Sequence, residues 1–223
     1  MPLKDVMATL KKLGKPSAAK TYQRHGAKDE CYGVSFADLG KLTKKLKGDH
    51  QLAWDLWGTK ISEARILGLM IADPVKLTAE QADAFVKDVH NRGYTYYLAC
   101  LVSRSPLASS KMKEWMKSDD EHVRSAGYNI VGVLAKDAPD SLSDAEGKKL
   151  LATIEKEIHG SANWARYAMN MALIGVGINK PGLRKQVLEV AKRIGKVDVD
   201  VGDTSCQVPD AASYIAKAAK RSR

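Results

Sequence analysis

The chain has 223 residues, 44% of them hydrophobic, which suffices for one large domain or two small ones with a sizeable core. Its 36 Lys and Arg against 26 Asp and Glu leave a formal charge of +10, which favours a polyanionic partner, nucleic acid before an anionic membrane. Three cysteines without a close pair argue against a disulfide framework and against structural zinc.

The first residues lack the apolar run of a signal peptide, and no segment reaches the roughly 20 apolar residues of a membrane span. The five histidines are scattered without metal-ligand spacing. We therefore expect a cytoplasmic, nucleoid-associated protein with no cofactor, no metal and no membrane partner.

Apolar residues recur at helical spacing along nearly the whole chain, which predicts helices. In chain order the predicted helices cover residues 3–13, a segment opened by Pro16, 36–46, 50–57, 62–71, a segment from 79, 94–103, 106–116, about 119–135, a segment from 144, 162–176, 181–194 and 209–219. Side-chain caps are predicted at Ser35, Asp49 and Ser161. Capping boxes are predicted to begin at Thr78, Ser118 and Ser143.

The tail after residue 195 changes character. Residues 196–201, KVDVDV, alternate as in a strand, but no partner strand is in view, so we predict extended chain. Asp198, Asp200 and Asp203 form an acidic cluster that suits a cation or, in our interpretation, a solvated loop. Residues 202–208 are predicted to be a loop before the final helix.

The predicted helices pair into units of roughly 30–40 residues, the range of HEAT-like repeats. We therefore predict an all-α fold, a superhelical stack of HEAT-like helical repeats (an α-α superhelix). It is expected to form a single domain over residues 1–223, with a C-terminal extended loop and helix. Such a stack has a concave face on which the surplus cations can gather.

Two helix starts carry candidate binding residues. Arg124 lies one turn into its helix, where it can reach a phosphate or pair with an acidic neighbour. Trp164 and Arg166 lie near the start of another helix, where an aromatic face can stack on a base and Arg can hold a phosphate. A core or structural role is the alternative for each.

Three tyrosines within residues 94–97 cannot all face a core, so at least one ring should line a groove or its hydroxyl must find a partner. Cys100 follows them without a nearby His or Lys to favour a thiolate. A buried, inert cysteine is therefore the preferred interpretation.

Five segments, in order, resemble the DNA alkylation repair proteins. Residues 32–39, YGVSFADL, resemble the family's YGV-x-x-x-x-L entry, and residues 50–70 resemble its HELA-x-x-LW and EAR-x-L segment. Residues 115–127, WMKSDDEHVRSAG, match its W-x-x-SD-x-x-x-x-R-x-A element, and residues 163–175 and 192–214 resemble a bacterial branch. The resemblance spans nearly the whole chain.

The resemblance implies a HEAT-like superhelix that holds duplex DNA on a basic concave face. Active members are DNA glycosylases that release N3- or N7-alkylated purines, with a carboxylate that stabilises the cationic sugar. Residue by residue, Tyr97 takes the family's Trp position, Leu101 replaces the expected catalytic Asp, and the second active-site Trp falls at Met171. Arg124 and Tyr22 keep the family's Arg and early aromatic residue.

We therefore predict a DNA-binding protein of this family that binds damaged or structured duplex or branched DNA as a monomer. Tyr22, Tyr97, Arg124, Trp164 and Arg166 are its expected DNA-binding residues. Excision of alkylated purines stays open because of Leu101. The alternatives are a non-catalytic DNA-structure-binding protein and a helical protein–protein scaffold.

Overall fold

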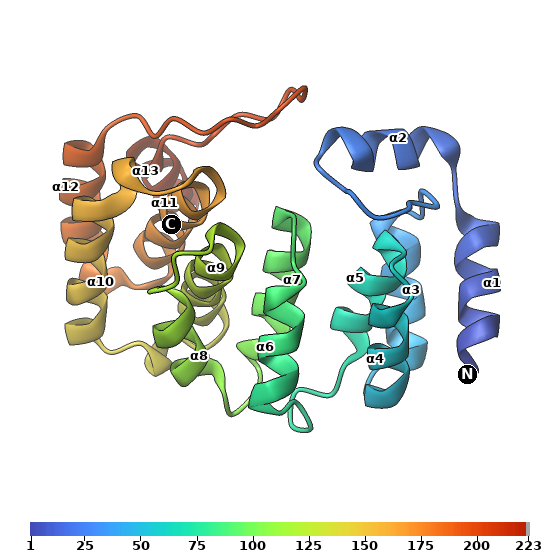
Figure 1. The fold of residues 1–223 in the computed structure, drawn as a ribbon. Helices are drawn as coiled ribbons and strands as arrows, with labels where there is room; N and C mark the ends of the chain where they lie inside the picture. The colour runs from blue at the N-terminus through green and yellow to red at the C-terminus, as the bar shows by residue number, and fades with distance from the viewer. Residues whose placement is uncertain (222–223) are drawn as a thin grey trace. The chain divides into compact units, whose positions relative to one another are not determined.

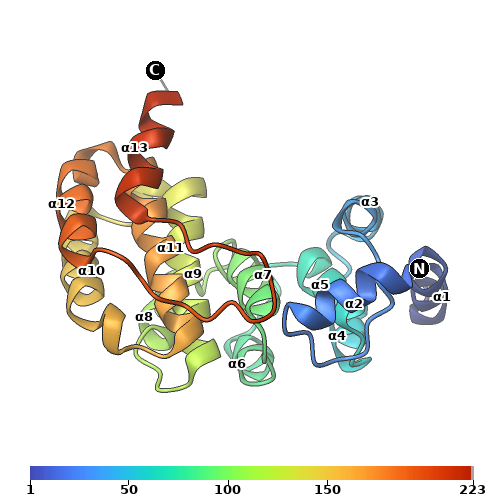
Figure 2. The same cartoon turned by 90° about the horizontal axis from the view of Figure 1, so that it is seen from above.

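The computed structural model describes residues 1–221, and all its regular elements within them are helices (Figures 1 and 2). The predicted all-α class is therefore confirmed. The chain groups into two compact units, which we call unit 1 (Met1–Pro106 with Val201–Ser205) and unit 2 (Leu107–Asp200 with Cys206–Arg223). The single domain over 1–223 stays a prediction. None of the helices in the described part of the chain combines the length and apolar character needed to cross a bilayer.

Unit 1 contains seven of the described α-helices: α1 (Leu3–Leu13), α2 (Pro16–Arg24), α3 (Phe36–Leu46), α4 (His50–Gly58), α5 (Ser62–Ile71), α6 (Ala79–Lys87) and α7 (Arg92–Val102). Helix α5 is central, because it packs against α3, α4 and α7. Gly68 allows α4 and α5 to approach closely, since a Cβ there would lie 2.6 Å from the carbonyl oxygen of Ala53.

A buried ion network joins α5 to the rest of unit 1. The Arg65 side chain is 1% exposed, and its guanidinium lies 3.0 Å from a carboxylate oxygen of Asp29 and 2.6 Å from one of Asp88. The same group lies 4.6 Å from the ring centroid of Trp57 and 5.9 Å from that of Tyr94. Trp57 and Arg65 are therefore parts of one structural cluster, in which the aromatic ring and the two carboxylates surround the guanidinium.

Unit 2 contains α8 (Ala108–Trp115), α9 (Glu121–Asp137), α10 (Asp144–Glu157), α11 (Asn163–Asn179), α12 (Arg184–Ile194) and α13 (Ala211–Arg221). Short 3₁₀ turns occur at Pro139–Ser141, Ile158–Gly160 and Pro181–Leu183. Helices α9 and α11 lie side by side along their length, α8 packs on α9, and α10 and α12 pack together on α11 (Figure 2).

Most predicted helix starts are confirmed. Ser35 and Asp49 accept hydrogen bonds from the backbone amides of Asp38 and Leu52, so both are N-caps. The capping boxes that begin at Thr78 and Ser143 are complete, because each N-cap and its N3 partner bond reciprocally.

Two predicted caps are wrong. Helix α9 is capped by Asp120, not Ser118, because the Asp120 carboxylate accepts from the amides of His122 and Val123. Ala162, not Ser161, is the N-cap residue of α11. A carboxylate from another helix compensates, since Glu121 accepts from the backbone amide of Trp164 at 2.5 Å.

Two helices begin later than the prolines that were predicted to open them. Helix α8 begins at Ala108, two residues after Pro106, and Pro181 opens a 3₁₀ turn before α12. Residues 196–201 form no strand, and the extended chain predicted there is confirmed.

Candidate nucleic-acid interface

An aromatic cluster forms where α2, the start of α3 and α7 meet in unit 1. We define it by Tyr22, Phe36 and Tyr97. The Phe36 ring centroid lies 5.7 Å from that of Tyr22 and 5.9 Å from that of Tyr97, and the latter pair is stacked with an interplanar angle of 20°. Phe36 is 48% exposed, so the cluster presents an aromatic surface to solvent. The structure thus brings the two predicted residues Tyr22 and Tyr97 together through Phe36.

Phe36 is more exposed than its helical spacing predicts. Its spacing places it on the same apolar stripe as Leu39, Leu42 and Leu46, which are buried, whereas Phe36 is half exposed. Phe36 is the first helical residue after the Ser35 cap, where the helix is just leaving the extended loop. The helical spacing therefore predicts the buried face of α3 correctly. The exposure of its first residue depends instead on how the neighbouring elements pack.

The loop before α3 is held by hydrogen bonds that also hold Tyr22. The Tyr22 hydroxyl donates to the carbonyl oxygen of Val34 at 2.7 Å. The buried Glu63 carboxylate accepts from the backbone amides of Tyr32, Gly33 and Val34 at 3.0, 2.5 and 3.1 Å. Four polar contacts thus fix the position of the Tyr22 ring relative to α3.

Gly33 is required at the centre of this loop. Its φ is +82°, and a Cβ there would lie 2.0 Å from the carbonyl oxygen of Lys15. The YGV sequence at residues 32–34 therefore has a structural reason: a glycine conformation that presents successive amides to one carboxylate.

A pocket of about 350 Å³ adjoins the aromatic cluster within unit 1. Its lining includes Tyr22, Phe36, Asn91 and Tyr94, and Glu63 contributes a carboxylate. Glu63 is only 1% exposed. Sequence reasoning missed Glu63, although its EAR motif was visible, because the three amides that it binds lie about 30 residues earlier in the chain.

Burial raises the pKa of both Tyr22 and Tyr97 above the ordinary phenol value. For Tyr22 the nearby Glu63 carboxylate adds to this effect, because a negative charge disfavours the phenolate. Both phenols are therefore neutral at physiological pH. Their rings carry no charge that would repel phosphate.

The three tyrosines of α7 have different environments, as their spacing predicted. Tyr94 is fully buried, and its hydroxyl donates to Asp29 at 2.7 Å. Tyr96 is 51% exposed, and its ring centroid lies 5.5 Å from that of Tyr97. Leu101, which the resemblance aligns with a catalytic Asp, is fully buried in the core.

In unit 2, Arg124 pairs with an acid. Its guanidinium donates to the Glu157 carboxylate of α10, and it also interacts with the hydroxyl of the buried Tyr128. Of the two predicted roles for Arg124, a phosphate contact or an ion pair with an acidic neighbour, the structure contains the ion pair. A phosphate at this position would therefore compete with Glu157 for the Arg124 guanidinium.

Arg166 is engaged with backbone carbonyls. It donates to the carbonyl oxygen of Ser161 at 2.9 Å and to that of Asp198 at 2.7 Å. These bonds tie the segment after α12 to the start of α11. Asn163 reinforces the tie, because its side chain donates to the Asp200 carbonyl oxygen at 2.8 Å and accepts from the Asp200 amide at 2.7 Å.

Trp164 is partly exposed at the start of α11, and its ring centroid lies 6.0 Å from that of Tyr167. Met171, which the resemblance aligns with the family's second active-site Trp, is also partly exposed. Within residues 1–221, no three His, Cys, Asp or Glu side chains gather as ligands for a metal ion.

Residues 6–214 match the family model described as DNA alkylation repair enzyme. The chain belongs to the DNA alkylation repair family. The predicted family resemblance is therefore confirmed over nearly the whole chain.

Two similar curated proteins come from Listeria. Uncharacterized proteins of Listeria innocua and Listeria monocytogenes are both 34% identical to this member of the family, over 219 and 221 residues. The alignments cover 95% of this chain and of the first protein, and 96% of this chain and of the second.

A solved structure is similar over 100% of this chain and 96% of its own, with a TM-score of 0.92 and 28% sequence identity. It is described as belonging to a new family of proteins related to the HEAT-like repeat DNA glycosylases with affinity for branched DNA structures. The predicted HEAT-like repeat fold is confirmed by this similarity.

Proposed function

We propose that the protein binds branched or distorted duplex DNA and uses the aromatic cluster of unit 1 to cover unpaired bases, without excising them. The observation that carries the proposal is the half-exposed ring of Phe36 stacked on Tyr97 and supported by Tyr22. Bases at a branch point lose stacking partners, and aromatic side chains replace those partners without regard to sequence.

The charge of the chain supports DNA as the partner. Unit 1 holds 17 Lys and Arg against 12 Asp and Glu, and unit 2 holds 19 against 14, so both carry the same surplus. The helices that hold Tyr22 and Phe36 also carry the exposed cations Lys20, Arg24, Lys44 and Lys45. Phosphate contacts beside the aromatic cluster would add affinity that falls with salt.

The environment of Leu101 supports binding without excision. Its side chain is apolar and fully buried, so this position offers neither a carboxylate for a cationic sugar nor access to one. The affinity for branched DNA described for the similar solved protein agrees with this proposal. Association with the nucleoid as a monomer is part of the same proposal.

A binding comparison tests the proposal. A labelled four-way junction and a linear duplex of equal length would be titrated with the full chain at several salt concentrations. We expect tighter binding of the junction and a linear fall of log affinity with log salt. Equal affinity for both DNAs, or affinity insensitive to salt, would contradict the proposal.

One observation favours a second candidate, excision of alkylated purines with Glu63 as the carboxylate. Glu63 lines the pocket together with Tyr22, and within residues 1–221 its Oε2 accepts one hydrogen bond, from the Tyr32 amide, which leaves an acceptor position open. A carboxylate there would stabilise a developing cationic sugar.

The two candidates separate in an excision assay. A labelled duplex containing 7-methylguanine or 3-methyladenine would be incubated with the wild type and with Glu63→Gln. Base release by the wild type that Glu63→Gln abolishes, at unchanged junction affinity, would establish the second candidate. Junction binding with no base release is the expected result.

A further inference from the structure

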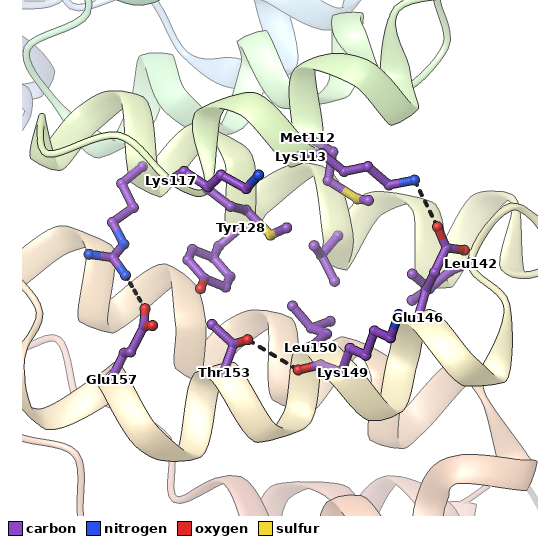
Figure 3. Close-up of a pocket in the computed structure, with 13 residues that line it drawn as sticks. Met112, Lys113, Lys117, Tyr128, Leu142, Glu146, Lys149, Leu150, Thr153 and Glu157 are labelled. Atoms are coloured by element: carbon purple, nitrogen blue, oxygen red, sulfur yellow. Dashed lines mark hydrogen bonds and ion pairs between the residues drawn. The ribbon is translucent and has the colours of Figure 1, made fainter.

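Unit 2 contains a pocket of about 720 Å³ that is separate from the aromatic cluster (Figure 3). It lies between α8 and α10, and α9 forms its floor. Tyr128 and Val131 of α9, which line this floor, are 1% and 0% exposed. Met112 of α8, Met116 directly after α8 and Leu150 of α10 also line it.

The rim of this pocket is positively charged. Lys113 and Arg124 each pair with an acid across the pocket, Lys113 with Glu146 at 2.8 Å and Arg124 with Glu157 (Figure 3). These pairs neutralise the two acidic residues that line it. The lining also includes Lys117 and Lys149, both exposed, and neither lies within ion-pair distance of a carboxylate in residues 1–221.

The shape of the pocket favours a side chain over a nucleic acid. Because the Tyr128 ring is almost fully buried, it offers no face on which a base could stack. Between the rim cations the lining is mainly apolar, with Met112, Val131 and Leu150, which offer phosphate no hydrogen-bond donors. One or two bulky apolar side chains, in contrast, fit into a pocket of this size, and flexible methionines such as Met112 and Met116 adapt to their shape.

We propose that this pocket binds an acidic segment of a partner protein, which inserts an apolar anchor side chain between α8 and α10. Carboxylates that flank the anchor would pair with Lys117 and Lys149 on the rim. This inference goes beyond DNA binding, and it depends on a different surface from the aromatic cluster. It also gives the scaffold alternative a definite location.

A peptide titration tests the inference. The probe is a fluorescent ten-residue peptide with four Asp around a single Phe, measured by anisotropy with the full-length protein. We expect a dissociation constant on the order of tens of micromolar. Peptides with Phe→Ala or with each Asp→Lys should lose detectable binding, because they lack the anchor or the charge.

Charge-reversal variants locate the site. Lys117→Glu with Lys149→Glu should weaken peptide binding about tenfold or more, since two rim contacts become repulsive. Lys148→Glu with Lys156→Glu is the matched control, because these exposed lysines of α10 do not line the pocket, and it should bind like the wild type. Thr153→Trp, which fills the pocket without a charge change, should also abolish binding.

Thermal denaturation of each variant checks that it is folded. Undetectable binding of the acidic Phe peptide by the folded wild type, or an equal loss in the matched control, would overturn the inference. Competition by a junction DNA would also overturn it, because it would indicate DNA as the occupant. A change in sedimentation mass caused by the Lys117 and Lys149 substitutions would do the same, because it would indicate a second copy of the chain. Because Phe36→Ala should leave peptide binding unchanged, failure of this inference is distinguishable from failure of the proposed function.

Discussion

Replacement of Phe36 by Ala is the sharpest test of the aromatic cluster. Its ring contacts both Tyr22 and Tyr97, with centroids 5.7 and 5.9 Å away, and 48% of the residue is exposed. The variant removes the ring that joins the cluster. It leaves the Ser35 cap of α3 in place, because that cap bonds the backbone amide of Asp38.

The two effects of Phe36→Ala have different sizes. Full burial of a Phe side chain is worth about 1.5–3 kcal/mol, so a half-exposed ring should cost the fold roughly 1 kcal/mol. A base stacked on an aromatic side chain is worth about 1–3 kcal/mol. Junction affinity should therefore fall roughly 5- to 150-fold, whereas the protein stays folded.

Fluorescence anisotropy with a labelled four-way junction measures the change in affinity, and urea denaturation measures the change in stability. Trp54→Ala is the matched control, because Trp54 is a partly exposed aromatic residue of the same unit that packs on Phe85 instead. Wild-type junction affinity in Phe36→Ala would refute the reasoning. An equal loss in Trp54→Ala would do the same.

Three further predictions concern ion pairs and tethers. Arg166→Ala should increase hydrogen exchange around Asp198 and leave the salt slope of DNA binding unchanged; a slope smaller by about one would instead reveal a phosphate contact. Arg65→Met should lower the free energy of unfolding by about 1.5–3 kcal/mol in urea titrations, because it removes the buried guanidinium from the 12% exposed Asp29, whereas Asp88 keeps its ion pair with Lys60; a loss below about 1 kcal/mol would contradict this. Hydrogen bonds from Lys113 and Ser143 lower the pKa of Glu146 from 4.5 to about 2, so its stabilisation is complete above pH 4.5 and lost as pH falls to about 2. The stability difference between wild type and Glu146→Gln should shrink over that interval, and a constant difference would count against the ion pair.

The part of the structure that depends on near neighbours in the sequence was predictable. The caps at Ser35 and Asp49 and the boxes at Thr78 and Ser143 bond groups three residues away, so their partners are visible in the sequence itself. The caps at Ser118 and Ser161 failed because acids bond the first amides of both helices: Asp120 accepts from His122 and Val123 at α9, and Glu121 accepts from Trp164 at α11.

The family was also visible in the sequence, whereas the absence of its acid at Leu101 stays a prediction from the resemblance. The matched segments run from residue 32 to residue 214, and the position of Leu101 follows from their order. The sequence likewise indicated that the tyrosines of α7 differ in environment. It did not indicate which neighbour each ring would meet.

Tertiary structure decided which polar groups are available. Arg124 meets Glu157, Arg166 meets the carbonyl oxygen of Asp198, and Glu63 meets the amides of residues 32–34, all across 29 or more residues. Helical periodicity determines which face a side chain occupies, but a partner on another helix depends on how the helices pack. For that reason the sequence by itself determined the helices, their main caps and the family, whereas only the fold showed that Phe36 completes the aromatic cluster and that two lysines line an apolar pocket.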